Sequence, residues 1–185
     1  MITFIKKVIK FTSIFYKIRD KLSTEVKKLI YFAFVHSLLN YGIEIYGNTY
    51  SSHLNKLFVL NNKILRILQH SSYDSPIIYL YSNYNTLSLP NLHKFNILLF
   101  VHKCLYHPHQ LPHVFSSYYL KNSDLHSYNT RSKNDPYLEQ FTTSLGQRCI
   151  IYKGSYLWCS LPDELKDISS TSLFKSRLKK YLQSQ

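Results

Sequence analysis

Apolar residues recur at three- and four-residue intervals along much of the chain, and this spacing limits the fold more than any other feature. Such intervals place the apolar side chains on one face of an α-helix, where they pack against a neighbouring element. Hydrophobic residues make up 45% of the 185 residues, which is enough to bury a core. We therefore expect a folded, mostly helical protein.

The periodicity predicts several helices, separated by polar and proline-containing segments. Ser23 has the position of an N-cap for the second helix, and the two glycines at 42 and 47 indicate a break. We expect mostly loop over 108–147, a short strand over 148–153 and a helical turn over 157–160. The helices are expected at 2–20, from 23 to about 40, from 51 or 52 to about 70, at about 76–82, at 91–107 and at 172–183.

These elements divide near residue 71 into two parts. Residues 1–70 are expected to form a three-helix bundle. Residues 71–185 are expected to form a helical, loop-rich extension that ends in a basic helix. We find neither an internal repeat nor a long low-complexity segment.

The charge balance is strongly positive. Lysine and arginine number 23 against 10 aspartates and glutamates, which gives a formal net charge of +13 and a pI near 9.6. A field of this sign attracts polyanions, among which nucleic acid is the commonest and an anionic membrane surface the second.

The basic residues fall into two clusters along the chain. One lies on the first and third predicted helices, and Lys27 and Lys28 of the second helix would add to this cluster. The other lies on the last helix, with Lys175, Arg177, Lys179 and Lys180. On this helix Leu173, Phe174, Leu178 and Tyr181 are expected to be buried. The residues expected to contact phosphates are Lys6, Lys7, Lys10, Lys56, Lys63 and Arg66.

Patterns typical of a self-sufficient active site are missing from the sequence. The close acidic group Asp163, Glu164 and Asp167 follows Pro162, where acids suit the start of a helix. No glycine-rich phosphate loop or GxSxG elbow occurs. His102, Cys104, His107, His109 and His113 are not spaced as zinc ligands. We expect no catalytic residue, metal, cofactor or small-molecule substrate.

Two further features of the sequence concern the cellular compartment and membrane association. The cysteines, Cys104, Cys149 and Cys159, are odd in number and widely spaced, which favours a reducing, intracellular compartment over a disulfide framework. No apolar run reaches the roughly 20 residues that a membrane span needs, so no integral membrane association is expected.

Several local motifs, in this order, resemble the end of the reverse transcriptase of non-LTR (LINE-type, jockey-like) retrotransposons. Tyr46 stands where that family usually has Trp, Asn61 where it has Gln and Cys159 where it has Asn. The similar segments are 41–49, 53–57, 61–68, 126–131 (His-Ser-Tyr-Asn-Thr-Arg), 152–162 and 174–182.

The resemblance implies the thumb and C-terminal extension of an RNA-directed DNA polymerase. The catalytic aspartates of that family lie in a palm segment of pattern FxDD, and this sequence has no such pair. The resemblance therefore implies a non-catalytic fragment of a transposable element, with the thumb helices holding the backbone of an RNA or RNA/DNA template–primer duplex.

Other interpretations remain open at this stage. An active polymerase fragment is disfavoured by the missing aspartate pair. The basic amphipathic segment 2–20 also suits a protein bound to a membrane surface. A third alternative is a retroelement remnant without function.

Overall fold

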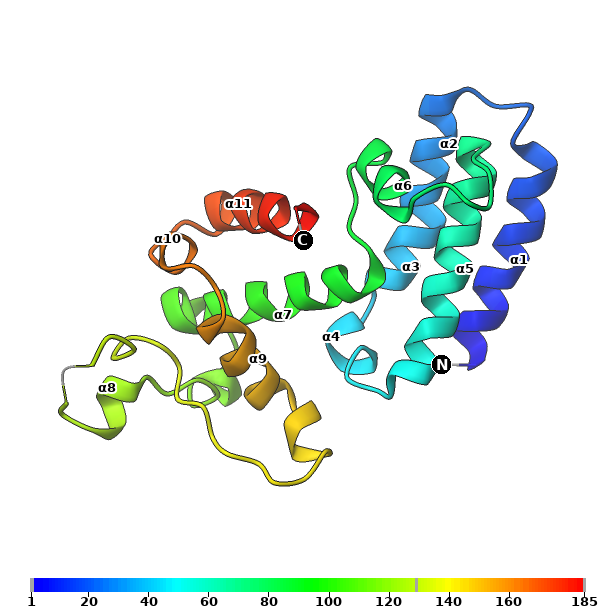
Figure 1. Ribbon diagram of the computed structural model, residues 1–185. Helices are drawn as coiled ribbons and strands as arrows, with labels where there is room; N and C mark the ends of the chain where they lie inside the picture. The colour runs from blue at the N-terminus through cyan, green and yellow to red at the C-terminus, as the bar shows by residue number, and fades with distance from the viewer. Residues whose placement is uncertain (1, 129, 185) are drawn as a thin grey trace. The chain divides into compact units, whose positions relative to one another are not determined.

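The structure, a computed structural model, describes residues 2–128 and 130–184; Asn129 of the 126–131 motif lies outside them. Over these residues all the regular elements are helices, and there is no strand, only an isolated antiparallel bridge between Lys121 and Pro136. The expectation of a mostly helical protein is confirmed (Figure 1).

The chain forms two compact units, residues 1–92 and 93–185, and the division falls within the long helix α7 (Leu89–Tyr106). Residues 71–92, which we assigned to the second part of the chain, thus belong to the first unit.

In the first unit, three long helical segments follow one another, and a shorter helix completes the unit (Figure 1). The first segment packs along the third, and the second also contacts the third. The elements are α1 (Ile2–Ile18), α2 (Thr24–Ile30), the π-helix η1 (Tyr31–His36), α3 (Ser37–Asn40), α4 (Ile43–Tyr46), α5 (Ser51–Gln69) and α6 (Ile77–Asn83).

Local signals set the ends of these helices as the sequence predicts. The Ser23 side chain accepts a hydrogen bond from the backbone N–H of Val26 at 3.4 Å, which caps α2. Gly42 separates α3 from α4 with a φ of +66°, a left-handed conformation that favours glycine. The predicted break is therefore a turn followed by one short helical turn.

A buried polar network explains why residues beyond 71 join the first unit. The Tyr31 hydroxyl donates to Asn61 Oδ1 at 3.2 Å, and Asn61 Nδ2 donates to the Tyr81 hydroxyl at 3.0 Å. Tyr81 in turn donates to Asn62 Oδ1 at 2.6 Å, and the Tyr84 ring meets the Tyr31 ring edge-on at 5.4 Å. Helix α6 and the turn after it are thereby fixed to α5 and η1.

The second unit begins within α7 and consists of short elements around the remaining long helices (Figure 1). Residues 116–128 and 130–145 have little regular structure, as expected for the predicted loop. The elements after α7 are η2 (Pro108–Gln110), η3 (His113–Phe115), α8 (Asn122–Leu125), η4 (Gly146–Arg148), α9 (Ile150–Cys159), α10 (Asp163–Lys166) and α11 (Thr171–Gln183).

An aromatic cluster holds α7, α9 and α11 together. The His102 ring stacks on Phe174 with centroids 4.2 Å apart, and Trp158 lies 5.7 Å from Phe174 and 6.3 Å from His102. These three side chains are almost fully buried. The cluster is therefore the centre of this unit's core.

Two expectations for the second unit are wrong. Residues 150–153 open α9 and are not a strand, because Gly154, Ser155 and Trp158 form one buried helical face that continues from this segment. On α11 the buried residues are Phe174, Leu178 and Leu182, whereas Leu173, expected in the core, is exposed.

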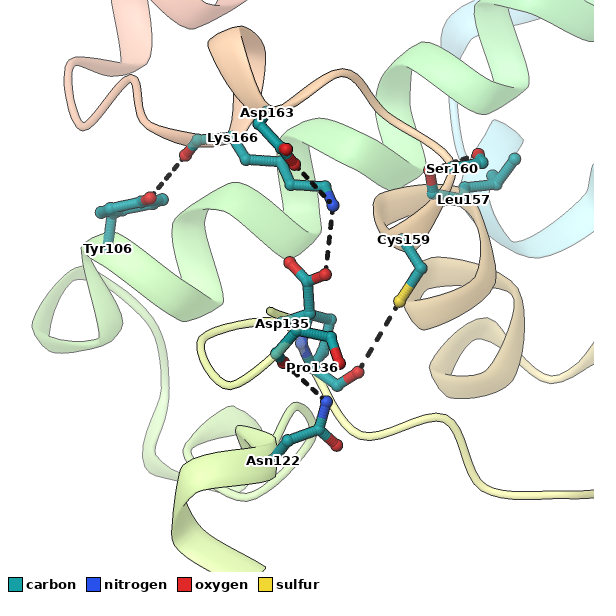
Figure 2. A network of polar contacts seen from close by, with 10 residues as sticks. Tyr106, Asn122, Asp135, Pro136, Leu157, Cys159, Ser160, Asp163 and Lys166 are labelled. Carbon is teal, nitrogen blue, oxygen red and sulfur yellow. Dashed lines mark hydrogen bonds and ion pairs between the residues drawn. The ribbon is translucent and has the colours of Figure 1, made fainter. Parts of the chain in front are cut away.

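A largely buried ion pair ties the loop to α10, as Figure 2 shows. Lys166 Nζ lies 3.1 Å from Asp135 Oδ2, with only 14% and 15% of the two side chains exposed, and 3.4 Å from Asp163 Oδ1. Burial opposes the charge on Lys166, but the hydrogen bond and attraction to Asp135 outweigh it, so the Lys166 pKa is raised. Asp163 is thus the first residue of α10 and forms an ion pair with Lys166 of the same helix.

No helix found between residues 2 and 184 combines the length and apolar character needed to cross a membrane.

Candidate nucleic-acid interface

Helix α1 carries a row of lysines on its solvent face. Lys6, Lys10 and Lys17 are exposed and follow one another at four and seven residues, which brings them to one side of a helix. Val8 and Phe15 are buried on the opposite side. Lys7 is also exposed and lies beside the row. The predicted residues of α1 therefore point away from the bundle core.

Helix α5 carries a second row. Lys56 and Lys63 are exposed and seven residues apart, so they lie on one face, two turns from each other. Asn61 and Leu68 are buried on the other face. The predicted lysines thus form two rows, each on the solvent side of its own helix.

Arg66, the sixth predicted residue, is half-buried and partly engaged. Its Nη2 donates to the Ser75 carbonyl at 3.4 Å, and its guanidinium carbon lies 5.5 Å from the centroid of the Tyr73 ring. Its Nε is buried and has no hydrogen-bond partner among the described residues. Arg66 therefore holds the segment after α5 while keeping a donor unused.

Acidic side chains do not neutralise the two rows. Asp20 lies 3.3 Å from Arg19 and 3.6 Å from His70 and forms no ion pair with a lysine of either row. Hydrogen bonds from its own backbone N–H and from Ser23 lower the pKa of Glu25 at the start of α2. Within residues 2–128 and 130–184, the five predicted lysines form no ion pair.

Lys27 and Lys28 do not join these rows as expected. Lys27 is buried, donates to the Arg19 carbonyl at 3.2 Å and lies 3.3 Å from His70 Nε2. Lys28 donates to the Asn83 carbonyl at 3.5 Å. Both ammonium groups serve contacts inside the unit, although only Lys27 is buried and Lys28 is half-buried.

A groove of about 1000 Å³, called the α5 groove below, runs beside α5. It is lined by residues of α5 between Asn55 and Ile67, by residues 70–73, and by Arg19 and Ile77. Two of the predicted residues, Lys63 and Arg66, lie in it.

Sequence reasoning did not single out Tyr73, His70 or Arg19 as site residues. Arg19 belongs to the basic run at the end of the first predicted helix, so the sequence carried a signal for it. Tyr73 and His70 come from the turn after α5, whose path back along the helix depends on the Arg66–Ser75 hydrogen bond.

The second basic cluster lies on α11 in the other unit. Lys175, Arg177 and Lys180 are exposed, and Lys179 is half-buried. Arg131 lines a depression with Asp135, Asp163 and Asp167 but forms no ion pair with any described residue.

The histidines around α7 make structural contacts. His102 Nε2 lies 2.7 Å from the Ile168 carbonyl and His107 Nε2 lies 2.9 Å from the Ser169 carbonyl. His109 and His113 are exposed. The part of the chain that the structure describes contains no group of three or more His, Cys, Asp or Glu able to hold a metal ion.

Comparison of the chain with known protein families, with curated proteins and with solved structures gives no match.

Proposed function

We propose that this protein binds the sugar–phosphate backbone of nucleic acid through the lysine rows of α1 and α5. The observation that carries the proposal is the set of exposed lysines, Lys6, Lys7, Lys10, Lys56 and Lys63, which have no acidic partner among the described residues. Unpaired ammonium groups on helix surfaces suit phosphate oxygens, and such contacts carry little sequence preference.

The finer proposal is a template–primer duplex of RNA or of RNA and DNA. It is supported by the motif resemblance to the thumb of non-LTR retrotransposon reverse transcriptases and by the arrangement of α1, α2–α3 and α5 as three long helical segments of one unit. In this proposal the unit acts as a thumb-like bundle that grips the duplex without reading bases.

The proposed role includes no catalytic step. The aspartate pair that the resemblance would require for nucleotidyl transfer does not occur in the sequence. A primer-extension assay with Mg²⁺ and a primed RNA template tests this point directly. We expect no extension, and incorporation of nucleotides by the purified chain would overturn the non-catalytic assignment.

Charge-neutral variants test the location of the interface. Replacing Lys6, Lys10, Lys56 and Lys63 by Gln should lower the affinity for a short RNA/DNA duplex by on the order of a hundredfold at low salt, because four phosphate contacts are lost. Fluorescence anisotropy with a labelled duplex measures the change.

A matched control separates the effect of the protein's net charge from the effect of where the lysines lie. Lys103 and Lys133 are exposed lysines of the other unit. The variant K103Q/K133Q should be compared with K56Q/K63Q, since both remove two positive charges. Equal losses of affinity in the two variants would show that net charge, and not the α5 row, sets the binding.

A membrane surface is the alternative partner, and Ile9 and Ile14 are exposed on α1 beside the lysines. However, Val8 and Phe15, which would enter a bilayer interface, are already buried in the unit. Co-sedimentation with anionic vesicles, compared with duplex binding at the same ionic strength, separates the two. Strong vesicle binding without duplex binding would favour the membrane.

A further inference from the structure

The α5 groove combines cationic and aromatic groups in a way that the lysine rows do not. It is about 1000 Å³ in volume, at the upper end of the range of roughly 300–1,000 Å³ that ligand sites occupy. We infer that this groove holds an unpaired nucleotide of a single-stranded segment, a site that extends the proposed backbone binding and rests on it.

The cationic side of the groove is formed by Lys63, Arg66 and Arg19. Lys63 and Arg66 form no ion pair among the described residues. Arg19 lies 3.3 Å from Asp20, which partly offsets the charge of Arg19, and His70 Nδ1 lies 3.6 Å from the same carboxylate. The net character is positive, as a phosphate group requires.

The aromatic side is formed by Tyr73, whose side chain is 85% exposed at the rim. The Arg66 guanidinium lies near this ring, 5.5 Å from its centroid, so the cation and the aromatic surface are adjacent. A base can stack on the ring while its phosphate reaches the cations. This pairing of stacking platform and basic groove is how proteins hold single strands.

Apolar residues complete the lining between these two sides. Phe58, Val59, Ile67 and Ile77 line the groove alongside the charged groups. In a duplex both faces of each internal base are covered by its neighbours, so an internal base must leave the stack to place a face on Tyr73. The groove therefore favours a single strand, or the unpaired end of a template, over a continuous duplex.

The test is a comparison of two probes with the full chain. A short labelled strand of thymidines and a blunt duplex of equal length are titrated against the wild type, Y73A and Y73F. We expect Y73A to weaken strand binding by about tenfold, the loss typical of one stacked base, while duplex affinity changes by less than about twofold. Y73F should bind the strand like the wild type.

Tyr41 provides the matched control, because it is 77% exposed in the same unit and does not line the groove. Y41A should leave strand binding unchanged, and thermal melting should show that Y41A and Y73A fold alike. If the wild type binds both probes and Y73A changes neither, or weakens both equally, the nucleotide site is overturned while backbone binding stands. If the wild type binds neither probe, both proposals fail.

Discussion

Gly154 sets how closely α9 approaches its neighbours. A Cβ placed there would lie 2.2 Å from the Tyr119 hydroxyl oxygen and 2.8 Å from Val101 Cγ2. The Tyr119 hydroxyl donates to the Ile150 carbonyl at 2.9 Å, so it is not free to move away. A glycine inside a helix costs roughly 1 kcal/mol relative to alanine, and here the close contact requires it.

We therefore predict that G154A destabilises the protein by about 1–3 kcal/mol, despite the better helix propensity of alanine. Urea unfolding followed by circular dichroism measures the change. The loss should shrink when Tyr119 is also replaced by Ala, because the main clash is removed. A G154A variant as stable as the wild type would contradict this account of α9.

His93 makes stability depend on pH. Burial, with a smaller effect of the nearby Lys153, lowers the His93 pKa to about 4, from an ordinary value of 6.5. Below pH 6.5 the unfolded chain takes up a proton at His93 that the folded chain does not. The free energy of unfolding therefore decreases as the pH falls toward 4. Burial lowers the His102 pKa as well, which acts in the same direction.

The predicted cost at His93 is about 3 kcal/mol between pH 7 and pH 4. Urea midpoints across this range test the prediction. H93L should flatten part of the profile, whereas H109L, a change at an exposed histidine, should leave it unaltered. An identical pH dependence in H93L and the wild type would contradict the assignment.

At the scale of elements, the Tyr31–Asn61–Tyr81 network joins η1, α5 and α6. Burial raises the pKa of both tyrosine hydroxyls, so they remain neutral donors at ordinary pH. Buried polar groups stabilise only when every partner is present, because each orphaned group keeps its desolvation cost.

We predict that N61A costs about 1–3 kcal/mol of stability, since it leaves the Tyr31 donor without its acceptor. Asn55 is an exposed asparagine on the same helix and gives a matched control. N55A should change the free energy of unfolding, measured by urea denaturation, by less than about 0.5 kcal/mol. Equal effects of the two substitutions would show that the network adds nothing.

The long helices could be predicted because their apolar spacing and caps are local signals. Ser23 and the paired glycines 42 and 47 marked the ends of helices correctly. The segment 150–153 was misread because Ile150 and Ile151 favour strands and Gly154 suggests a break. Its helical state is stabilised by the hydrogen bond from the Tyr119 hydroxyl to the Ile150 carbonyl and by the packing of Trp158, in the same helix, against Phe174. Both contacts join residues that are distant along the chain.

For the whole molecule, the exposure of the α1 and α5 lysines followed from helical spacing, whereas the groove did not. The groove needs the turn after α5 to fold back, which depends on Arg66 and on the network around Asn61. The burial of Lys27 was likewise invisible in the sequence, because its partners are the Arg19 carbonyl and His70 of other elements. Net charge therefore indicates the class of partner that we propose, and tertiary contacts determine which cations stay exposed.

The salt dependence of duplex binding tests the central proposal most directly. Each phosphate neutralised contributes about −0.9 to the slope of log K against log salt concentration, so contacts from the five exposed lysines give a slope of about −4.5. We predict such a steep, linear fall for the full chain with an RNA/DNA duplex. An affinity that stays constant between low and physiological ionic strength would contradict backbone binding by these lysines.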